Sequence, residues 1–234
     1  MILFFGQRIS ENLFQLQDDE YHHCFKVTRH RLGDAILVTD FQGVIWNGFI
    51  ESDSTKTCDI KLASVYKTEH IGDANIVLAI SPTQQMERFE WFVEKSVEAG
   101  VHEIIPLHCA RTENTRIKAV RLEKISLSAA KQTLRPLLPK IHPMVSFNTL
   151  VTAADFNQKF ICHCEDGTEG FIGKKYNARE SVLILIGPAG DFTGEEIQLA
   201  KQSGFLAVDL GPQRLRTETA GLAALMILQT IKNL

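Results

Sequence analysis

The sequence lacks the features that mark membrane-spanning, secreted or disulfide-stabilised chains. No apolar run approaches the roughly 18 to 20 residues that a membrane-spanning helix needs. The apolar start, residues 1–5, is too short for the core of a signal peptide, and no basic segment precedes it. The five cysteines stand at scattered spacings, which favours reduced thiols over a disulfide framework. We therefore expect a cytoplasmic protein without a membrane partner.

Several motifs of nucleotide, metal and hydrolase sites are also missing. The sequence contains neither a P-loop nor a G-x-G-x-x-G segment, and no Ser-His-Asp pattern stands out. The segment Cys162-His163-Cys164 is too short for a metal site and lacks a second ligand pair, so we expect no metal. Its alternation fits a strand better, with the cysteines buried on one face.

What remains is the composition of a globular protein with an uneven charge distribution. Hydrophobic residues make up 44% and charged residues 23% of 234 residues, enough for a sizeable core. The net charge is −3, but residues 111–140 carry eight basic and two acidic side chains and are therefore at +6. Such a stretch is either a solvated helix face or a binding surface for a polyanion such as RNA.

The first 72 residues have the pattern of a small β-barrel. Turn signals at Gly33-Asp34 and Gln42-Gly43 separate short β-rich runs. The strands are predicted at residues 2–5, 35–39, 44–50 and 58–65, with one helix at residues 18–29. One barrel with one helix is the simplest interpretation.

Residues 73–234 alternate between strand and helix patterns and predict a mostly parallel α/β domain. Thr193 and Glu196 have the spacing of a capping box at the start of a helix. The predicted strands are at 76–80, 104–105, 160–164, 181–187 and 206–210. The predicted helices are at 87–99, 117–134, 194–204 and 217–233. The domain boundary is predicted near Asp73.

Two loops that follow late strands carry the candidate chemistry. The first is GPAGDF, residues 187–192, and the second is LGPQRLRTETA, residues 210–220. Glycines let a backbone approach a ligand closely, and ligands bind at the carboxyl ends of strands in open α/β sheets. Taken singly, each loop is also compatible with a tight connection between strand and helix.

Together, the two loops resemble those of the 16S ribosomal RNA uridine-N3 methyltransferases of the SPOUT superfamily. That family has a GPEGGF-like loop followed by an LG-x-x-ILRTETA-like loop. Three further segments resemble the family in the same order: KVTR at residues 26–29 with Gly33-Asp34, EKSVEAGV at 94–101, and AAKQTLR at 129–135. The sequence departs from the family at Ala189 and Asp191, and it lacks a lysine near residues 83–87.

The resemblance implies the architecture and the reaction. The implied fold is a PUA-like β-barrel at residues 1–72 that binds RNA, followed at residues 73–234 by a SPOUT domain with a trefoil knot. The implied reaction is methyl transfer from S-adenosylmethionine to N3 of a uridine in 16S rRNA of the small ribosomal subunit. The implied assembly is a homodimer. The last helix either packs at the dimer interface or belongs to the hydrophobic core of its own domain.

The resemblance also assigns site residues. The implied cofactor-binding residues are Ile186, Gly187, Pro188, Gly190, Leu210, Gly211, Leu215, Thr217, Thr219 and Ala220. Arg216 is the candidate for stabilising charge on the uracil. Glu218 is a candidate base or hydrogen-bond acceptor, or it pairs with Arg216 at the start of the helix. The candidate RNA-binding residues are Arg8, His23, Lys26, Arg29, Arg31, Arg88, Arg111, Arg116 and Arg135.

Two other functions remain open on the sequence. One is a non-catalytic RNA-binding or ribosome-assembly factor that keeps the fold, which the substitution at Ala189 makes conceivable. The other is a SPOUT methyltransferase that acts on a different RNA. Affinity for S-adenosylmethionine separates the first alternative from an enzyme.

Overall fold

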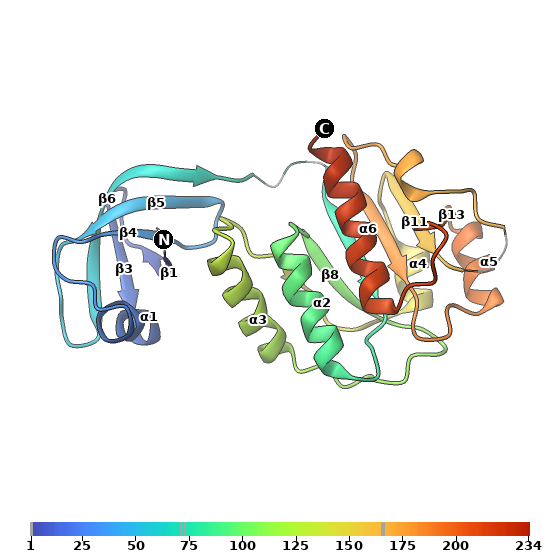
Figure 1. The fold of residues 1–234 in the computed structure, drawn as a ribbon, viewed down its shortest axis with the longest axis horizontal. Coiled ribbons are helices and arrows are strands. Elements are labelled where there is room, and N and C mark those ends of the chain that lie inside the picture. Colours follow the sequence, from blue (N-terminus) through green and yellow to red (C-terminus); the bar gives the residue numbers. More distant parts are fainter. Residues whose placement is uncertain (1, 71, 73, 165–166) are drawn as a thin grey trace. The chain divides into compact units, whose positions relative to one another are not determined.

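The computed structural model describes residues 2–70, 72, 74–164 and 167–234. Its contacts divide the chain into two compact units (Figure 1). The first consists of Met1–Ile71 together with Leu127–Leu138, and the second of Gly72–Ser126 together with Pro139–Leu234. The predicted boundary residue, Asp73, lies outside the described residues. The division at residues 72 and 73 stays a prediction, to which the structure adds that residues 127–138 belong with the first unit.

The first unit contains a six-stranded sheet whose two edges meet at Gly6. The strand order is β1-β4-β5-β6-β3-β2, so that consecutive strands of the chain form opposite edges. Only Gly6 separates the end of β1 from the start of β2, and the sheet must therefore curl into a barrel. A Cβ atom built on Gly6 would overlap the carbonyl oxygen of Gln15, so that only glycine fits at this junction. The strands are β1 Leu3–Phe5, β2 Gln7–Arg8, β3 Leu13–Gln17, β4 Ala35–Thr39, β5 Val44–Ile50 and β6 Thr57–Thr68.

The helix predicted at residues 18–29 is two short elements. Helix α1, Asp18–His22, continues directly into a π-helical turn, His23–Val27. The hydroxyl of Thr28 then donates to the carbonyl oxygens of His23 and Cys24, at 3.0 and 2.8 Å, and ends the element. Arg29 follows with a left-handed φ of 59°, which places it outside any helix.

Two ion pairs and a backbone hydrogen bond attach residues 127–138 to the barrel. Lys131 pairs with Glu20 at 2.6 Å, and Arg135 with Glu69 at 3.3 Å. The amide of Gly43 donates to the carbonyl of Pro136 at 3.0 Å. These contacts explain why the end of helix α3, Ala119–Gln132, belongs with the first unit. They join segments that are distant in the sequence, and no local sequence pattern predicts them.

The second unit is built on a parallel sheet of seven strands. The order is β10-β8-β7-β12-β11-β13, with β9 paired to β8, and every pair is parallel. The strands are β7 Ile76–Ile80, β8 Glu103–His108, β9 Lys140–Ile141, β10 Val145–Ser146, β11 Gln158–Cys162, β12 Val182–Ile186 and β13 Leu206–Val208. The helices are α2 Met86–Glu98, α3 Ala119–Gln132, α4 Phe147–Ala153, α5 Gly194–Gln202 and α6 Thr217–Lys232, with a 3₁₀ turn at Ile172–Lys174.

Helices cover both faces of this sheet, and each face has its own hydrophobic core. Along β7, the side chains of Ile76, Leu78 and Ile80 enter one core, whereas Val77 and Ala79 enter the other. The first core includes residues of α2, α3 and α6, and the second includes residues of α4 and α5. Strands buried on both faces read as continuous apolar runs, which is why the patterns of β7 and β12 are so clear in the sequence.

The predicted elements agree with the structure where apolar periodicity is strong. The strands predicted at residues 35–39, 44–50 and 76–80 are confirmed residue for residue, as is the capping box of Thr193 and Glu196. The strands predicted at 160–164 and 206–210 were wrong at their ends, because they stop at Cys162 and Val208. Cys164 therefore lies outside the strand and is exposed, while Cys162 is buried.

The sequence-based interpretation misses several short elements. Three of them, β2, β9 and β10, have only two residues each, too few for a periodic signal, and β3, α4 and the 3₁₀ turn at Ile172–Lys174 are missed as well. The α/β class, the parallel sheet and the small β domain are confirmed, and the trefoil knot stays a prediction. Among the helices that the described residues form, none combines the length and apolar character needed to cross a bilayer.

Close packing of α6 against α2 generates a prediction about stability. A Cβ atom on Gly221 would lie 2.6 Å from the ring of Phe92 and 2.8 Å from the Cδ1 of Ile80. We expect Gly221→Ala to lower the free energy of unfolding by about 1–3 kcal/mol through overpacking, despite the better helix propensity of alanine. Urea denaturation checks this. Gly194→Ala is the control, since no described atom lies within 4 Å of its added Cβ, and an equal loss in both variants would contradict the packing argument.

Candidate functional site

The parallel register brings the two glycine-containing loops to one edge of the sheet. Ile186, the last residue of β12, pairs in register with Cys162, and Cys162 also pairs with Val208, the last residue of β13. The loops that leave β12 and β13 therefore start from neighbouring strand ends. The end of β7 lies there too, since the amide of Ser81 donates to the carbonyl of Ile186 at 3.0 Å. This edge is where open α/β sheets bind ligands.

The first loop, residues 187–193, contains a tight turn with two successive left-handed residues. Gly187 and Pro188 are buried, and Gly190 and Asp191 have φ angles of 88° and 68°. The amide of Asp191 donates to the carbonyl of Pro188 at 3.0 Å and closes the turn. Glycine adopts this conformation without steric cost, and aspartate is one of the few other residues that tolerate it.

The backbone of Asp191 adopts the unfavourable left-handed conformation, and its side chain stabilises the turn through hydrogen bonds. Its Oδ1 accepts from the amide of Phe192 at 2.8 Å, and its Oδ2 accepts from the amide of Cys164 at 2.7 Å. The departure from the family motif at this position is therefore a hydrogen-bonding aspartate that ties the first loop to the segment after β11. Ala189, the other departure, is exposed at the tip of the turn.

In the structure the second loop spans residues 209–216, because residues 217–220 belong to α6, and a hydrogen bond at the start of α6 joins it to the first loop. The hydroxyl of Thr217, the first residue of α6, donates to the carbonyl of Gly187 at 3.0 Å. Within the second loop, Gly211 has a φ of 111°, and its amide donates to Oδ1 of Asp209 at 3.0 Å. The two loops that the sequence singles out are thus one structural feature, and Thr217 is the residue that couples them.

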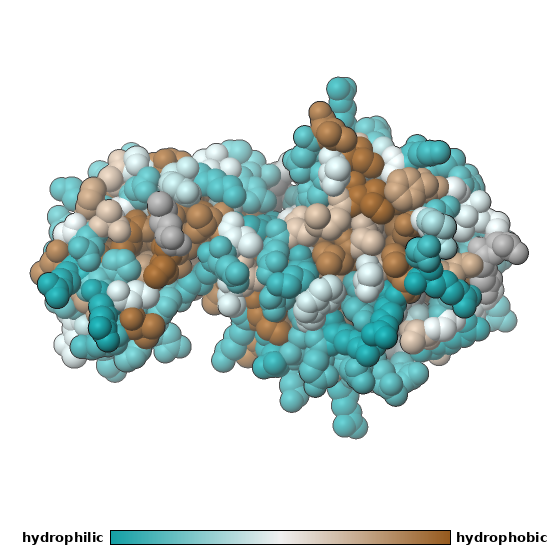
Figure 2. Space-filling model, viewed as in Figure 1, coloured by the Kyte–Doolittle hydropathy of each residue, from teal (hydrophilic) through white to brown (hydrophobic). Residues whose placement is uncertain are grey.

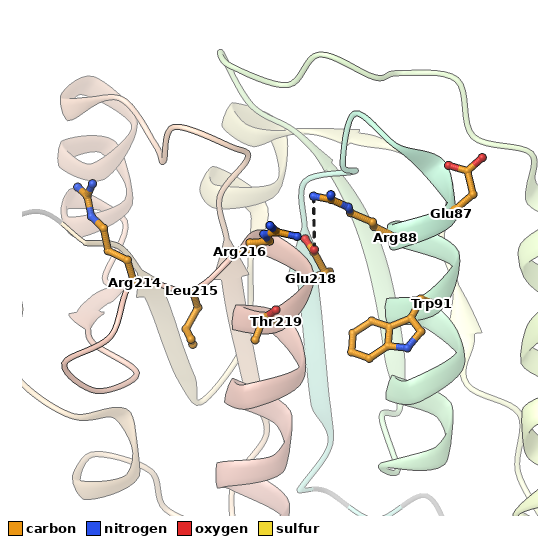
Figure 3. A pocket seen from close by; sticks show the side chains of 8 residues that line it. All are labelled: Glu87, Arg88, Trp91, Arg214, Leu215, Arg216, Glu218 and Thr219. Carbon is orange, nitrogen blue, oxygen red and sulfur yellow. Dashed lines mark ion pairs between the residues drawn. The ribbon is translucent and has the colours of Figure 1, made fainter.

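A cavity of about 650 Å³ opens beside the second loop, between the starts of α2 and α6 (Figure 3). Its walls carry three arginines, two glutamates and a tryptophan. The lining residues are Glu87, Arg88, Trp91, Arg214, Leu215, Arg216, Glu218 and Thr219. This combination of cations, carboxylates and an aromatic surface suits a planar polar ligand that carries negative charge.

Glu218 and Arg88 form the ion pair of this cavity. Nη1 of Arg88 lies 3.9 Å from Oε1 of Glu218, and the Glu218 side chain is only 10% exposed. The alternative that Glu218 pairs with Arg216 is therefore replaced by a pairing with Arg88. At 3.9 Å the contact is too long for a hydrogen bond, so that the carboxylate retains acceptor capacity toward the cavity. Figure 3 shows Arg216 and Arg88 on either side of Glu218.

Sequence reasoning missed Trp91, whose indole ring lines the cavity. Trp91 follows Arg88 by three residues on α2, so that both lie on one face of the helix. It is 42% exposed, whereas the apolar stripe of the same helix, Phe89, Phe92 and Val93, is fully buried. An aromatic residue outside the apolar stripe of an amphipathic helix was the signal available in the sequence.

The predicted cofactor residues fall into three groups. Gly187, Gly190, Gly211 and Thr217 form the coupled loops described above. Leu215 and Thr219 line the cavity. The other four are less accessible: Ile186 and Pro188 are buried, and Leu210 and Ala220 pack against the hydrophobic core that α2 and α6 share.

The predicted RNA-binding residues are distributed over both units. Arg8, His23, Lys26, Arg29, Arg31 and Arg135 lie in the first, and Arg88, Arg111 and Arg116 lie in the second. Lys26, Arg29 and Arg31 are exposed around the π-helical turn, and His23 is half-buried there with its ring 5.5 Å from that of Phe4.

Two of these arginines have clear structural contacts within the first unit. Arg8 stacks over Trp46 at 5.1 Å and donates to the carbonyls of Ser10 and Glu11, at 3.3 and 3.1 Å. Arg135 is 5% exposed and paired with Glu69, which leaves little of its guanidinium surface for a phosphate. Arg116, by contrast, is exposed on the segment between β8 and α3.

Across the described residues, no group of three or more histidine, cysteine, aspartate or glutamate side chains is arranged to hold a metal ion. The segment at Cys162 to Cys164 illustrates why. Cys162 and His163 are buried and Cys164 is exposed, so that the two thiols face different surroundings.

Comparison with known proteins gives two matching family models. The RNA methyltransferase domain matches residues 72–229, and the RNA methyltransferase PUA domain matches residues 16–63. The fold superposes on a probable rRNA-methyltransferase from Porphyromonas gingivalis with a TM-score of 0.91 and 36% identity, over 100% of this chain and 99% of the other.

Two further relatives carry a more specific name. A ribosomal RNA small subunit methyltransferase E from Neisseria gonorrhoeae, bound to S-adenosyl methionine, superposes with a TM-score of 0.84 and 26% identity, covering 98% of this chain and 97% of that one. Ribosomal RNA small subunit methyltransferase E from Bacillus subtilis is 28% identical over 226 residues, which cover 91% of this chain and 88% of the relative.

The contact between Asp191 and the segment after β11 predicts the reactivity of Cys164. Partial desolvation of the sulfur and the nearby carboxylate of Asp191 both raise the pKa of the Cys164 thiol, which lowers its thiolate fraction at a given pH. We expect Ellman's reagent at pH 8 to label Cys164 alone and slowly, since the other four thiols are buried, and Asp191→Asn to accelerate the labelling. Loss of the signal in Cys164→Ser is the control, and an unchanged rate in Asp191→Asn would contradict the electrostatic explanation.

Proposed function

Because the chain belongs to the RNA methyltransferase family defined by these two domains, we propose that it methylates N3 of a uridine in 16S rRNA with S-adenosylmethionine as methyl donor. The observation that carries the proposal is the coupling of the two glycine-containing loops through Thr217 and Gly187, directly beside the arginine-rich cavity. The relatives named small subunit methyltransferase E support the choice of substrate.

The residues at the loops fit the proposed cofactor. No described atom lies within 4 Å of a Cβ built on Gly211, and a Cβ on Gly190 would have only Arg111 nearby, at 3.8 Å. The missing side chains leave room for a ligand to approach the backbone, whose polar groups suit an adenine ring and an amino-acid moiety. Leu215, at the edge of the cavity, supplies an apolar contact.

Bound S-adenosylmethionine supplies a methyl group activated on a sulfonium sulfur. The protein has a different task, because N3 of uracil carries a proton and becomes nucleophilic only as that proton leaves. Negative charge then spreads onto O2 and O4. A site for this reaction must accept the proton, stabilise the anion and align N3 for attack.

The cavity provides groups for each of these requirements. Arg216 carries a permanent positive charge and lies beside Glu218, where it stabilises the oxygen on which charge develops. The carboxylate of Glu218 accepts the N3 proton, which passes on to solvent. Arg88 holds Glu218 in place through their ion pair. The indole of Trp91 offers a surface on which the uracil ring stacks.

The proposed RNA contacts outside the cavity come from basic side chains exposed in both units. Lys26, Arg29 and Arg31 surround the π-helical turn of the first unit, and Arg116 lies in the second. Such side chains position a substrate through its phosphates without reading its sequence. The proposed substrate is 16S rRNA of the small ribosomal subunit, encountered in the cytoplasm.

The proposal includes a homodimer. Met226 on α6 is 49% exposed. In Figure 2, apolar residues gather along α6 on the face in view. An apolar surface of this kind on a helix is typical of an interface with a second protein surface.

Transfer of labelled methyl groups tests the function directly. Small ribosomal subunits that lack the modification are incubated with the protein and S-adenosylmethionine, and the methylated nucleoside is identified. We expect N3-methyluridine. Absence of transfer into subunits and into free 16S rRNA, with cofactor binding absent as well, would instead favour a non-catalytic RNA-binding protein.

Arg216 should contribute to the chemical step and not to cofactor binding. We expect Arg216→Ala to lower kcat by about 10²–10³-fold, the typical effect of removing one group that stabilises a developing anion. The affinity for S-adenosylmethionine should stay near that of the wild type. Arg179→Ala, which removes an exposed arginine near the start of β12, is the matched control. Unimpaired turnover in Arg216→Ala would contradict the assignment.

A further inference from the structure

Arg111 lies on the loop after β8, and its hydrogen bonds point to the first glycine-containing loop. Nη1 of Arg111 donates to the carbonyl oxygen of Gly190 and, at 3.3 Å, to that of Phe192. These two carbonyls flank Asp191, the strained residue of the turn. Hydrogen bonds from a charged donor are stronger than neutral ones, so the guanidinium is well suited to fix both peptide planes.

A buried glutamate makes a second link between the same two loops. Oε2 of Glu196 accepts from the amide of Thr193 at 2.9 Å, as part of the capping box of α5. Its Oε1 accepts from the amide of Ala110 at 2.8 Å. Glu196 is only 8% exposed. The loop after β8 is therefore attached both to the middle and to the end of the first glycine-containing loop.

The loop that carries Arg111 is itself anchored to the sheet edge. The hydroxyl of Thr112 accepts from the amide of Cys109 at 2.8 Å and hydrogen-bonds to the hydroxyl of Ser81 at 2.8 Å. Ser81 in turn donates its amide to Ile186 at the end of β12. Arg111 thus projects from a hydrogen-bonded segment toward the loop that it contacts.

We propose that Arg111 is a positioning residue for the cofactor site: it holds the turn at Gly190 to Phe192 in the conformation that binds S-adenosylmethionine. The inference rests on the proposed function and assigns Arg111 a role different from the RNA contact that its place in a basic stretch suggests. The turn contains two left-handed residues and is exposed at its tip. Fixing it in advance removes an ordering cost that cofactor binding would otherwise bear.

Binding and kinetics of three variants test this role. Isothermal titration with S-adenosylmethionine in the absence of RNA is combined with the KM values for cofactor and for small ribosomal subunits. We expect Arg111→Ala to raise the Kd and KM for S-adenosylmethionine about tenfold, as the loss of two charge-assisted hydrogen bonds predicts, and to leave the KM for subunits within about twofold. Arg111→Lys should recover part of the affinity, since an ammonium can still reach one carbonyl.

Arg116→Ala is the matched control, because Arg116 lies five residues away on the same basic segment. It should leave the Kd for S-adenosylmethionine unchanged and raise the KM for subunits. The urea midpoint of each variant without ligand should match that of the wild type, which separates loop positioning from global stability.

The outcomes separate a failure of the positioning role from a failure of the proposed function. Wild-type affinity for S-adenosylmethionine in Arg111→Ala would overturn the positioning role. If the KM for subunits alone rises in this variant, the result would instead support an RNA contact. A wild-type protein without measurable affinity for S-adenosylmethionine would overturn the proposed function and the positioning role with it.

Discussion

The parallel pairing of β12 with β7 and β11 is the constraint on which the site depends. All five residues of β12 are buried and pair in register with both neighbours. A strand in this position fixes where its carboxyl end lies, and with it the start of the first glycine-containing loop. The end of β13 follows through β11. The residues of the two loops and of the cavity all belong to elements that leave or enter this edge of the sheet.

The edge supports a loop that is locally strained. Gly190 and Asp191 adopt left-handed conformations in succession, and the surrounding segments compensate with side-chain hydrogen bonds. Asp191 reaches the segment after β11, Arg111 and Glu196 connect to the loop after β8, and Thr217 connects to α6. Strained backbone conformations persist only where interactions with neighbouring segments hold them in place, and they are concentrated at functional sites. The departure from the family motif at Asp191 is compatible with the loop for the same reason.

For several residues, the contacts and the exposure of the side chain differ from what the neighbouring residues in the sequence suggest. Arg111, Arg116 and Arg135 belong to one basic stretch, yet Arg111 contacts a loop, Arg116 is exposed and Arg135 is buried against Glu69. Glu218 has Arg216 two residues away in the sequence, but its ion pair is with Arg88 on another helix. Trp91 became part of the cavity only because α2 and α6 pack side by side, as Figure 1 shows.

The sequence by itself determined the features that depend on local periodicity and turn chemistry. It set the strands β4, β5 and β7, the capping box of α5, the α/β class and the two loops that contain the site. These follow from apolar patterns and from residues such as glycine and threonine, whose preferences are local. The tertiary structure decided the pairing of distant side chains, the attachment of residues 127–138 to the first unit and the composition of the cavity. Such contacts join segments tens of residues apart, and no local preference of the chain encodes which side chain will face which.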